Sequence, residues 1–274
     1  MYRIVEKKTL SETVKLMKIE APYIARNAKA GQFVMLRIDE KGERIPLTIA
    51  DSDRENGLVT IIFMEIGKTT KELGTLKVGD NILNFVGPLG KPSEIERYGR
   101  VACIGGGVGI APLYPIIKAL KQVGNHVTSI LGARNKSLLI LEEEINNWSD
   151  ELYIATDDGS KGLKGFVSDV LQKLIDEGKT FDIAWVVGPV IMMKVVANLT
   201  RKYNIKTVVS LNPIMVDGTG MCGSCRVSVG GKTMFACVDG PEFDGHLVDY
   251  DNLMQRNNRF IEEERESCKL AGVL

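Results

Sequence analysis

The sequence lacks the features that mark nucleic-acid-binding or membrane proteins. It has 35 basic and 35 acidic residues among 274, so it offers no excess positive charge to attract nucleic acid or an anionic membrane. Its first residues, "MYRIVEKKTLSETVKL", contain no uninterrupted apolar run of the kind that directs export, so a cytoplasmic location is expected. The two most apolar stretches, "VACIGGGVGIAPLYPII" and "IAWVVGPVIMM", are both too short or too interrupted to supply the roughly 20 apolar residues of a membrane span.

Histidine and cysteine are also scarce. His126 and His246 are the only histidines, and neither is assigned to catalysis. The five cysteines are an odd number, and Cys222, Cys225 and Cys237 fall within sixteen residues. A disulfide framework would spread its cysteines along the chain, so this crowding favours metal ligation.

The patterning divides the chain into three parts. Residues 1–98 contain short apolar or alternating runs, such as "GQFVMLRI", "RIPLTIA" and "GLVTIIFMEI", separated by turn signals, which predicts a small antiparallel β-barrel with a helical insert at "KTTKELGTL". In residues 99–212 strand and helix patterns alternate, which predicts a doubly wound parallel sheet. Residues 213–274 hold the clustered cysteines and end in a charged segment, "NNRFIEEERESCKL", that is expected to be helical.

A glycine-rich turn lies at the first strand–helix junction of the parallel-sheet region. In "CIGGGVGIAPLYP" a buried strand runs into Gly105, Gly106, Gly107 and Gly109 and then into a helix. Glycines let the backbone approach a pyrophosphate, whose charge is favoured at a helix N-terminus. The position predicts nucleotide binding, and a purely structural turn is the alternative. The end of the second strand reads "GARNKS", without the carboxylate that usually binds a ribose.

Two segments of the predicted barrel also suit phosphate groups. "RIPLTIA" carries Arg44, whose guanidinium matches phosphate oxygens, and Thr48, whose hydroxyl can bond a ring nitrogen. In "EIGKTTKELG", Gly67 leads into a helix whose first turn carries Thr69 and Thr70, so free amides and hydroxyls are available to a second phosphate. Taken singly, these are also the features of an edge strand with a surface arginine and of a capped short helix.

The motifs R-x-P-x-T, G-x-x-T and GGGxGxAPLYP, in this order, resemble the ferredoxin–NADP reductase superfamily. With the cysteine loop, the chain is similar to the family of electron-transfer subunits of dihydroorotate dehydrogenase B and small subunits of NADH-dependent reduced ferredoxin:NADP oxidoreductase, which are also described as sulfide dehydrogenase subunits. The resemblance covers essentially the whole chain. It implies an FAD-binding barrel at 1–98, an NAD(P)-binding domain at 99–212 and a [2Fe–2S] region with a tail at 213–274.

The resemblance also implies ligand roles for individual residues. Two barrel segments would hold FAD: Arg44, Pro46, Leu47, Thr48, Ile66, Gly67, Lys68, Thr69 and Thr70. The glycine turn and three later strand ends would meet the nicotinamide nucleotide: Gly105, Gly106, Gly107, Gly109, Ala111, Pro112, Arg134, Asp157, Gly188 and Pro189. The nucleotide is expected to be NAD(H) rather than NADP(H), although Arg134 could equally meet a 2′-phosphate or stack on adenine.

The cysteine loop departs from the family pattern at one position. Dihydroorotate dehydrogenase subunits have C-x4-C-x2-C with a fourth cysteine downstream, whereas this chain has Asp217-x4-Cys222-x2-Cys225-x11-Cys237. A carboxylate is a hard anionic ligand that ferric iron accepts, so these four residues are expected to bind the cluster. Cys268 is the alternative fourth ligand, and zinc with the same residues is a further alternative.

The resemblance implies an oxidoreductase subunit that moves electrons between NAD(H), FAD and [2Fe–2S], with no catalytic side chain beyond the flavin. A larger iron–sulfur flavoprotein subunit, as in a heterodimer, and ferredoxin are the expected partners, while nucleic acid and membranes are not. The direction of flow and electron bifurcation stay open. The alternatives are a dihydroorotate dehydrogenase B subunit, a self-contained reductase for a diffusing acceptor, and a non-enzymatic regulator that binds nucleotide and metal.

Overall fold

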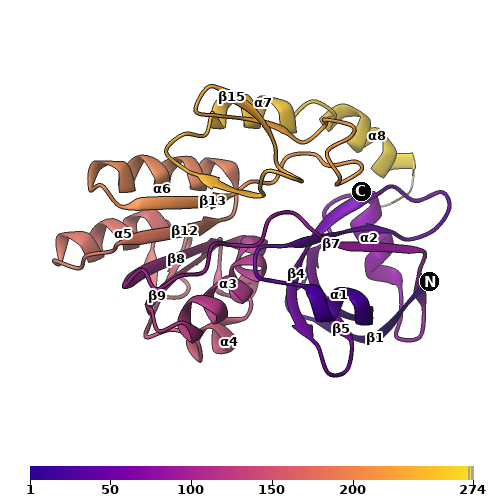
Figure 1. Cartoon of the computed structure of the whole chain (residues 1–274), viewed down its shortest axis with the longest axis horizontal. Helices are drawn as coiled ribbons and strands as arrows, with labels where there is room; N and C mark the ends of the chain where they lie inside the picture. Colours follow the sequence, from indigo (N-terminus) through magenta and orange to yellow (C-terminus); the bar gives the residue numbers. More distant parts are fainter. Residues whose placement is uncertain (271, 273–274) are drawn as a thin grey trace.

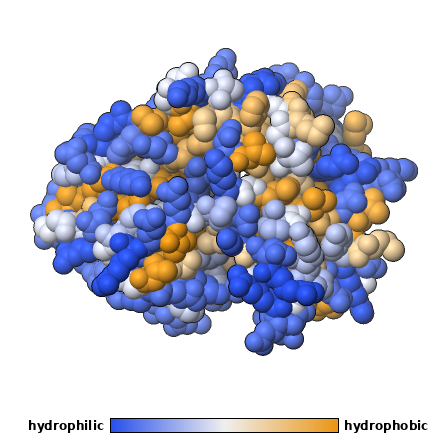
Figure 2. All heavy atoms as spheres, in the orientation of Figure 1, coloured by the Kyte–Doolittle hydropathy of each residue, from blue (hydrophilic) through white to orange (hydrophobic). Residues whose placement is uncertain are grey.

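The computed structural model describes residues 1–270 and 272. Figure 1 shows a barrel of N-terminal strands on the right and a sheet with helices on the left, while the C-terminal residues, in yellow, run across the top of both. No helix among the described residues is long and apolar enough to cross a membrane. In Figure 2, hydrophilic side chains cover most of this face and apolar ones form small groups between them.

The N-terminal sheet is antiparallel and nearly closes on itself. Its seven strands run in the order β6-β1-β2-β5-β4-β3-β7. The two edge strands, β6 and β7, are separated in sequence only by Leu83, so one segment of chain supplies both edges. The strands are β1 (Tyr2–Thr9), β2 (Val14–Glu20), β3 (Phe33–Arg37), β4 (Ile45–Asp53), β5 (Leu58–Met64), β6 (Asn81–Ile82) and β7 (Asn84–Leu89). The predicted barrel is therefore present.

Two short helices accompany the barrel. The predicted helical insert is α2 (Lys68–Thr75), which follows β5, and a helix that the sequence patterns did not indicate is α1 (Pro22–Asn27). Alternate strand residues, such as Ile19 and Ile61, fill the interior and are fully buried. Burial of a side chain of this size stabilises the fold by about 1.5–3 kcal/mol, so the apolar alternation fixes which face points inward.

The second sheet has the predicted parallel, doubly wound arrangement, with one antiparallel strand at its edge. Its order is β11-β10-β9-β8-β12-β13-β16, and only β16 runs antiparallel to its neighbour. The strands are β8 (Arg100–Gly106), β9 (His126–Ala133), β10 (Glu151–Thr156), β11 (Leu163–Lys164), β12 (Ile183–Val187), β13 (Lys206–Ser210) and β16 (Glu242–Asp244). The helices are η1 (Gly107–Gly109), α3 (Ile110–Gln122), η2 (Lys136–Leu138), α4 (Glu142–Asn146), α5 (Val167–Asp176) and α6 (Val190–Lys202).

Both faces of this sheet are covered by helices because its strands alternate between two cores. Val101 and Cys103 of β8 pack with α3 and α4, whereas Ala102 and Ile104 pack with α5 and α6. The first core also takes in Ala50 and Ile62 of the barrel, so α3 lies between the sheet and the barrel. The continuous apolar run of β8 is thus explained by burial on both faces.

The C-terminal region packs on the α5–α6 side of the molecule and on the barrel. It contains the hairpin β14 (Arg226–Val229) and β15 (Lys232–Phe235), the edge strand β16, and helices α7 (Tyr250–Asn257) and α8 (Ile261–Leu270). The hairpin and α7 were not indicated by the sequence patterns, whereas α8 lies in the segment expected to be helical. Helix α7 contacts α6 and β14, and α8 contacts α2 of the barrel.

One half-buried glutamate lies where the three parts of the chain meet. Glu242 of β16 accepts a hydrogen bond from Ser93 Oγ at 2.6 Å, in the segment that links barrel and sheet. It accepts a second from Trp185 Nε1 of β12, at 3.2 Å. Gly31, just before β3, lies against Ser93. A Cβ added to Gly31 would lie 2.3 Å from Ser93 Oγ, so a larger residue at this position would displace the Ser93 hydroxyl. Burial raises the pKa of Glu242, because no cation is paired with it among the described residues.

Candidate functional site

The two barrel segments predicted to hold FAD are joined by a hydrogen bond. Thr69 Oγ1 donates to Glu43 Oε2 at 3.1 Å, which ties the start of α2 to the chain just before Arg44. Arg44 itself is exposed, whereas Thr69 is buried. Glu43 was not among the predicted residues, because a surface glutamate before a strand carries no distinguishing pattern.

The N-terminus of α2 has the form of a phosphate cradle. Gly67 is its N-cap, with φ −104°, and no atom lies within 4 Å of the position that a Cβ on Gly67 would occupy. Thr70 Oγ1 accepts the backbone amides of Ile66 and Gly67, each at 3.1 Å. The first-turn amides of Lys68 and Thr69 have no partner within the helix, which leaves donors for an anion in front of Gly67.

Strand β4 carries Pro46, Leu47 and Thr48 and lies next to β3. In the register of this pair Pro46 faces Met35, and Thr48 faces Phe33. All three residues are half-buried, so they present side chains that are only partly covered by the barrel.

The residues predicted to meet the nicotinamide nucleotide gather at one edge of the parallel sheet. The glycine turn follows β8, Arg134 follows β9, Asp157 follows β10 and Gly188 follows β12. From β8 the chain adds β9 and β10 on one side of the sheet and then β12 and β13 on the other side. Sheets with such a switch bind ligands beside it, at the carboxyl ends of the strands. Arg134 and Asp157 are exposed.

The glycines of this edge permit close approach of two backbones. A Cβ on Gly109 would lie 2.5 Å from the carbonyl oxygen of Val187, so no larger residue fits between β12 and α3. Gly107 has φ +57°, and no atom lies within 4 Å of the position that an added Cβ would occupy, which makes it the least crowded glycine of this edge. Ala111 is buried in the first turn of α3, and Pro112 beside it is half-buried. The same edge of the sheet also includes Gly105, Gly106 and Pro189. Gly105 of β8 pairs with Val187 of β12.

The cysteine loop brings two of the four predicted metal ligands into contact. Cys225 and Cys237 are buried, with their sulfur atoms 3.2 Å apart. Burial, and then the neighbouring Cys225, raise the pKa of Cys237 to about 12. Cys222 is exposed and lies 3.2 Å from Ser224 Oγ, which lowers the pKa of its thiol.

Asp217 faces the same loop from its start. Its carboxylate accepts the amides of Thr219 and Cys222, at 2.8 and 2.7 Å, and these bonds lower its pKa. In this arrangement no group of three or more His, Cys, Asp or Glu side chains within residues 1–270 and 272 is gathered as a metal site. The donor set nevertheless fits an iron–sulfur cluster, because three thiols and a carboxylate lie on one short loop. Cys268 is buried on α8, which contacts α2 of the barrel.

Both candidate redox regions touch the barrel. Gly218, next to Asp217, has φ +76°, and an added Cβ would lie 2.5 Å from Met35 Cγ of β3. On the other side, the glycine turn η1 contacts β5, and Lys118 of α3 forms an ion pair with Asp51 of β4 at 2.9 Å. The barrel is thus the common neighbour of the nucleotide edge and the cysteine loop.

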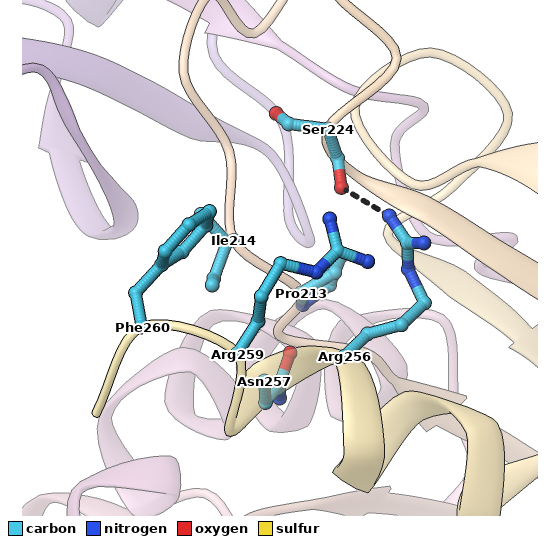
Figure 3. A pocket seen from close by; sticks show the side chains of 7 residues that line it. All are labelled: Pro213, Ile214, Ser224, Arg256, Asn257, Arg259 and Phe260. Carbon is cyan, nitrogen blue, oxygen red and sulfur yellow. Dashed lines mark hydrogen bonds between the residues drawn. The ribbon is translucent and has the colours of Figure 1, made fainter. Parts of the chain in front are cut away.

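A small cavity next to the cysteine loop holds two arginines. Figure 3 shows Arg256 and Arg259 with their guanidinium groups toward Ser224, across a cavity of about 20 Å³. Arg256 Nη2 donates to the carbonyl oxygen of Ser224 at 3.0 Å. The sequence patterns gave no indication of this cavity, since arginines on a polar helix commonly face solvent.

Models of three protein domains match successive parts of the chain. An oxidoreductase FAD-binding domain matches residues 1–93, and an oxidoreductase NAD-binding domain matches residues 103–198. The iron–sulfur cluster binding domain of dihydroorotate dehydrogenase B matches residues 212–249. The dihydroorotate dehydrogenase B electron transfer subunit homolog of Thermotoga maritima is 54% identical over 264 residues, covering 96% of this chain and 93% of that protein.

This chain belongs to the family of dihydroorotate dehydrogenase B electron-transfer subunits and their homologues. The electron transfer subunit of dihydroorotate dehydrogenase B from Desulforamulus reducens is 36% identical over 240 residues, covering 85% of this chain and 91% of that protein. The structure of an NADH-dependent reduced ferredoxin-NADP oxidoreductase, described for flavin-based electron bifurcation, superposes with a TM-score of 0.94 at 52% identity, covering 98% of this chain and 97% of that one.

Membership of this family confirms the predicted class of protein and its cofactor types. The chain is an oxidoreductase subunit with FAD-binding, NAD-binding and iron–sulfur-binding domains. The non-enzymatic regulator is therefore excluded as a description of the chain. The individual ligand residues and the domain limits stay predictions.

Proposed function

We propose that this chain carries electrons between NAD(H) and a larger redox subunit, by way of FAD and a [2Fe–2S] cluster. Bound FAD supplies the conversion, since it exchanges a hydride with nicotinamide and single electrons with an iron–sulfur centre. The supporting observation is the contact of Gly218 with Met35, because Met35 pairs with Pro46 on the strand proposed to line the flavin.

The chain's own residues bind and orient. Gly67 and the first amides of α2 would hold the FAD pyrophosphate with Arg44, while Pro46, Leu47 and Thr48 would flank its ring. Gly107 and its neighbours would hold the nicotinamide nucleotide at the edge that contacts the barrel through η1. This contact would bring the two sites together, and hydride exchange between stacked rings requires such geometry rather than a general base.

We propose four residues as the cluster ligands: Asp217, Cys222, Cys225 and Cys237. Cys225 and Cys237 are already in contact, whereas Asp217 and Cys222 would exchange their present hydrogen bonds for metal bonds. The domain limits that we propose are 1–98, 99–212 and 213–274.

A cytoplasmic location is part of the same proposal, and cell fractionation tests it.

A larger partner is inferred because the homologues are named as electron-transfer subunits, and one similar structure is a ferredoxin-NADP oxidoreductase. We therefore propose a heterodimer in which the partner carries the other redox site, with ferredoxin as its further reactant. Turnover of a diffusing acceptor by the isolated chain, at the rate of the assembled enzyme, would instead support a self-contained reductase.

The test is anaerobic purification followed by assay of flavin, iron and acid-labile sulfide, with visible spectra and EPR after reduction. We expect FAD together with iron and sulfide in the ratio of a [2Fe–2S] cluster, and bleaching of the flavin by NADH. Colourless protein without flavin or sulfide would overturn the proposal. A parallel titration with NADPH decides the nucleotide, because NADPH as the clearly better reductant would reverse our choice of NAD(H).

A further inference from the structure

Three arginines surround the part of the cysteine loop between Cys222 and Cys225. Arg226 begins β14, and its Nη1 donates to the carbonyl oxygen of Gly223 at 2.7 Å. Arg256, on α7, donates to the next carbonyl, that of Ser224, at 3.0 Å. Arg259 follows α7, and its guanidinium points into the same cavity as that of Arg256 (Figure 3).

These positive charges have no negative partner in the described part of the chain. None of the three arginines has a carboxylate within 4 Å among residues 1–270 and 272. Arg256 Nε is buried without a hydrogen-bond partner. Burial, and then the charges of Arg259 and Arg226, lower the pKa of Arg256, while Cys225 acts in the opposite direction. Arg226 and Arg259 are exposed and Arg256 is half-buried, so water screens only part of the repulsion among the three charges, and a negative group at the loop would offset the rest.

The cluster would supply that counter-charge. Ferric ions and sulfides held by three thiolates and one carboxylate carry net negative charge, and one-electron reduction adds a further negative unit. Positive charge beside the cluster therefore favours its reduced form. A separate organic anion does not fit, because a cavity of about 20 Å³ has room for about one water molecule.

We propose that Arg226, Arg256 and Arg259 form the counter-charge of the iron–sulfur cluster and hold its reduction potential above the value that the loop alone would give. The arginines are positioning residues that act through the loop and the cluster. The inference rests on the proposed cluster ligands, and it concerns how readily the cluster accepts its electron from flavin or partner.

The test is a dithionite titration of the full chain with its cluster, followed by the EPR signal of the reduced cluster. Because dithionite replaces nucleotide and partner, the result does not depend on the proposed electron route. Iron and sulfide assays reveal separately whether the cluster itself is present. The variants are Arg256→Gln, Arg256→Lys and Arg259→Gln. Among the described residues Arg259 contacts the ring of Phe260 and makes no hydrogen bond to the loop, so its substitution removes charge without breaking such a bond. The control is Arg26→Gln on α1, which changes net charge equally and lies away from α7 in Figure 1.

We expect Arg256→Gln and Arg259→Gln to lower the potential, and Arg256→Lys to remain closer to the parent protein because it keeps the charge. Arg26→Gln should leave the potential unchanged. The differences should shrink in high salt, where the Debye length falls from about 10 Å at 0.1 M to about 3 Å at 1 M. An unshifted potential in Arg259→Gln would overturn the proposal. Equal shifts in Arg256→Lys and Arg256→Gln would also overturn it, since they would assign the effect to the hydrogen bond.

Discussion

At the scale of single residues, Asp217 decides the character of the cluster loop. Its carboxylate accepts two backbone amides in the structure, yet it stands where the sequence pattern predicts the first cluster ligand. Both a turn-forming role and a ligand role use the carboxylate oxygens, but a neutral amide oxygen can accept a hydrogen bond while binding iron poorly, and a thiolate can bind iron in their place. Substitutions that keep one role and remove the other can therefore separate them.

We predict that Asp217→Cys keeps the cluster and alters its reduction potential, because thiolate can replace carboxylate as a ligand. Asp217→Ala should lose the cluster, and the neutral Asp217→Asn, which still accepts an amide, should bind iron less well than Asp217→Cys. Iron and sulfide content and EPR measure these outcomes. Full cluster content in Asp217→Asn but none in Asp217→Cys would assign Asp217 to the turn alone.

Gly67 offers a test of the FAD cradle. A methyl group on Gly67 would enter space that is empty of protein atoms, so Gly67→Ala should lower the free energy of unfolding of flavin-free protein by no more than about 1 kcal/mol. The same methyl group would stand where a pyrophosphate approaches the first amides of α2, so FAD affinity should fall by tenfold or more. Flavin fluorescence measures the affinity. Unchanged affinity would remove Gly67 from the proposed site.

At the scale of elements, the important contact is that between the cysteine loop and β3. Met35 packs against Gly218 while its strand pairs with β4, so one strand separates the loop from the proposed flavin residues. Gly218 has a positive φ, which an alanine adopts at a cost of about 1–2 kcal/mol. Its Cβ would in addition displace Met35.

We predict that Gly218→Ala destabilises the protein more than Gly231→Ala does. Gly231 has a similar φ of +75° but no atom near its Cβ position, so the pair isolates the contact with Met35. The difference should be about 1–3 kcal/mol, the usual penalty of overpacking, and reduction of the cluster by flavin should slow. Denaturant unfolding and stopped-flow spectra measure the two effects. Equal destabilisation by both substitutions would show that the contact contributes nothing.

The elements also show what the sequence could predict. The glycine turn and α2 were predictable because glycine at a strand end and threonine at a helix start have direct backbone consequences. The strands β1 and β2 were less evident, since their half-buried residues, such as Lys15 and Lys18, interrupt the apolar pattern. The closeness of Gly218 to Met35 could not be predicted, because it depends on how separate parts of the chain pack.

At the scale of the whole molecule, Glu242 connects barrel, parallel sheet and C-terminal region. Its raised pKa means that the folded chain binds a proton more tightly than the unfolded chain, whose glutamates titrate near 4.5. The folded state therefore loses stability as pH rises from about 4.5 toward the raised pKa, by at most about 1.4 kcal/mol per pH unit. Below 4.5 both states are protonated and the effect disappears.

We predict that Glu242→Gln removes this pH dependence. The difference in unfolding free energy between parent and variant should change in favour of the variant as pH rises above about 4.5, and it should be constant at lower pH. Denaturant unfolding at a series of pH values measures it, with Glu20→Gln as an exposed control whose charge is not among the causes of the raised pKa of Glu242. A parent and variant whose curves run parallel above 4.5 would show that Glu242 titrates normally.

The whole arrangement was partly predictable. Alternation of strand and helix predicts the parallel sheet, and the spacing of cysteines predicts a metal loop, because both are local patterns. Glu242 and Arg256 carried no such pattern, since an acidic or basic residue in a polar segment usually faces solvent. Their roles arise only when β16 and α7 return to strands and loops formed much earlier in the chain.

The antiparallel strand β16 covers an edge of the parallel sheet, and this matters for chains that fold without iron. Its residues 242–244 cover the outer side of β13, from Val208 to Ser210, and they follow the cysteine loop directly in sequence. If a metal-free loop released this strand, β13 would be left with unpaired amides and carbonyls that can bond to another molecule. Chains without the cluster would then aggregate more readily than chains that contain it.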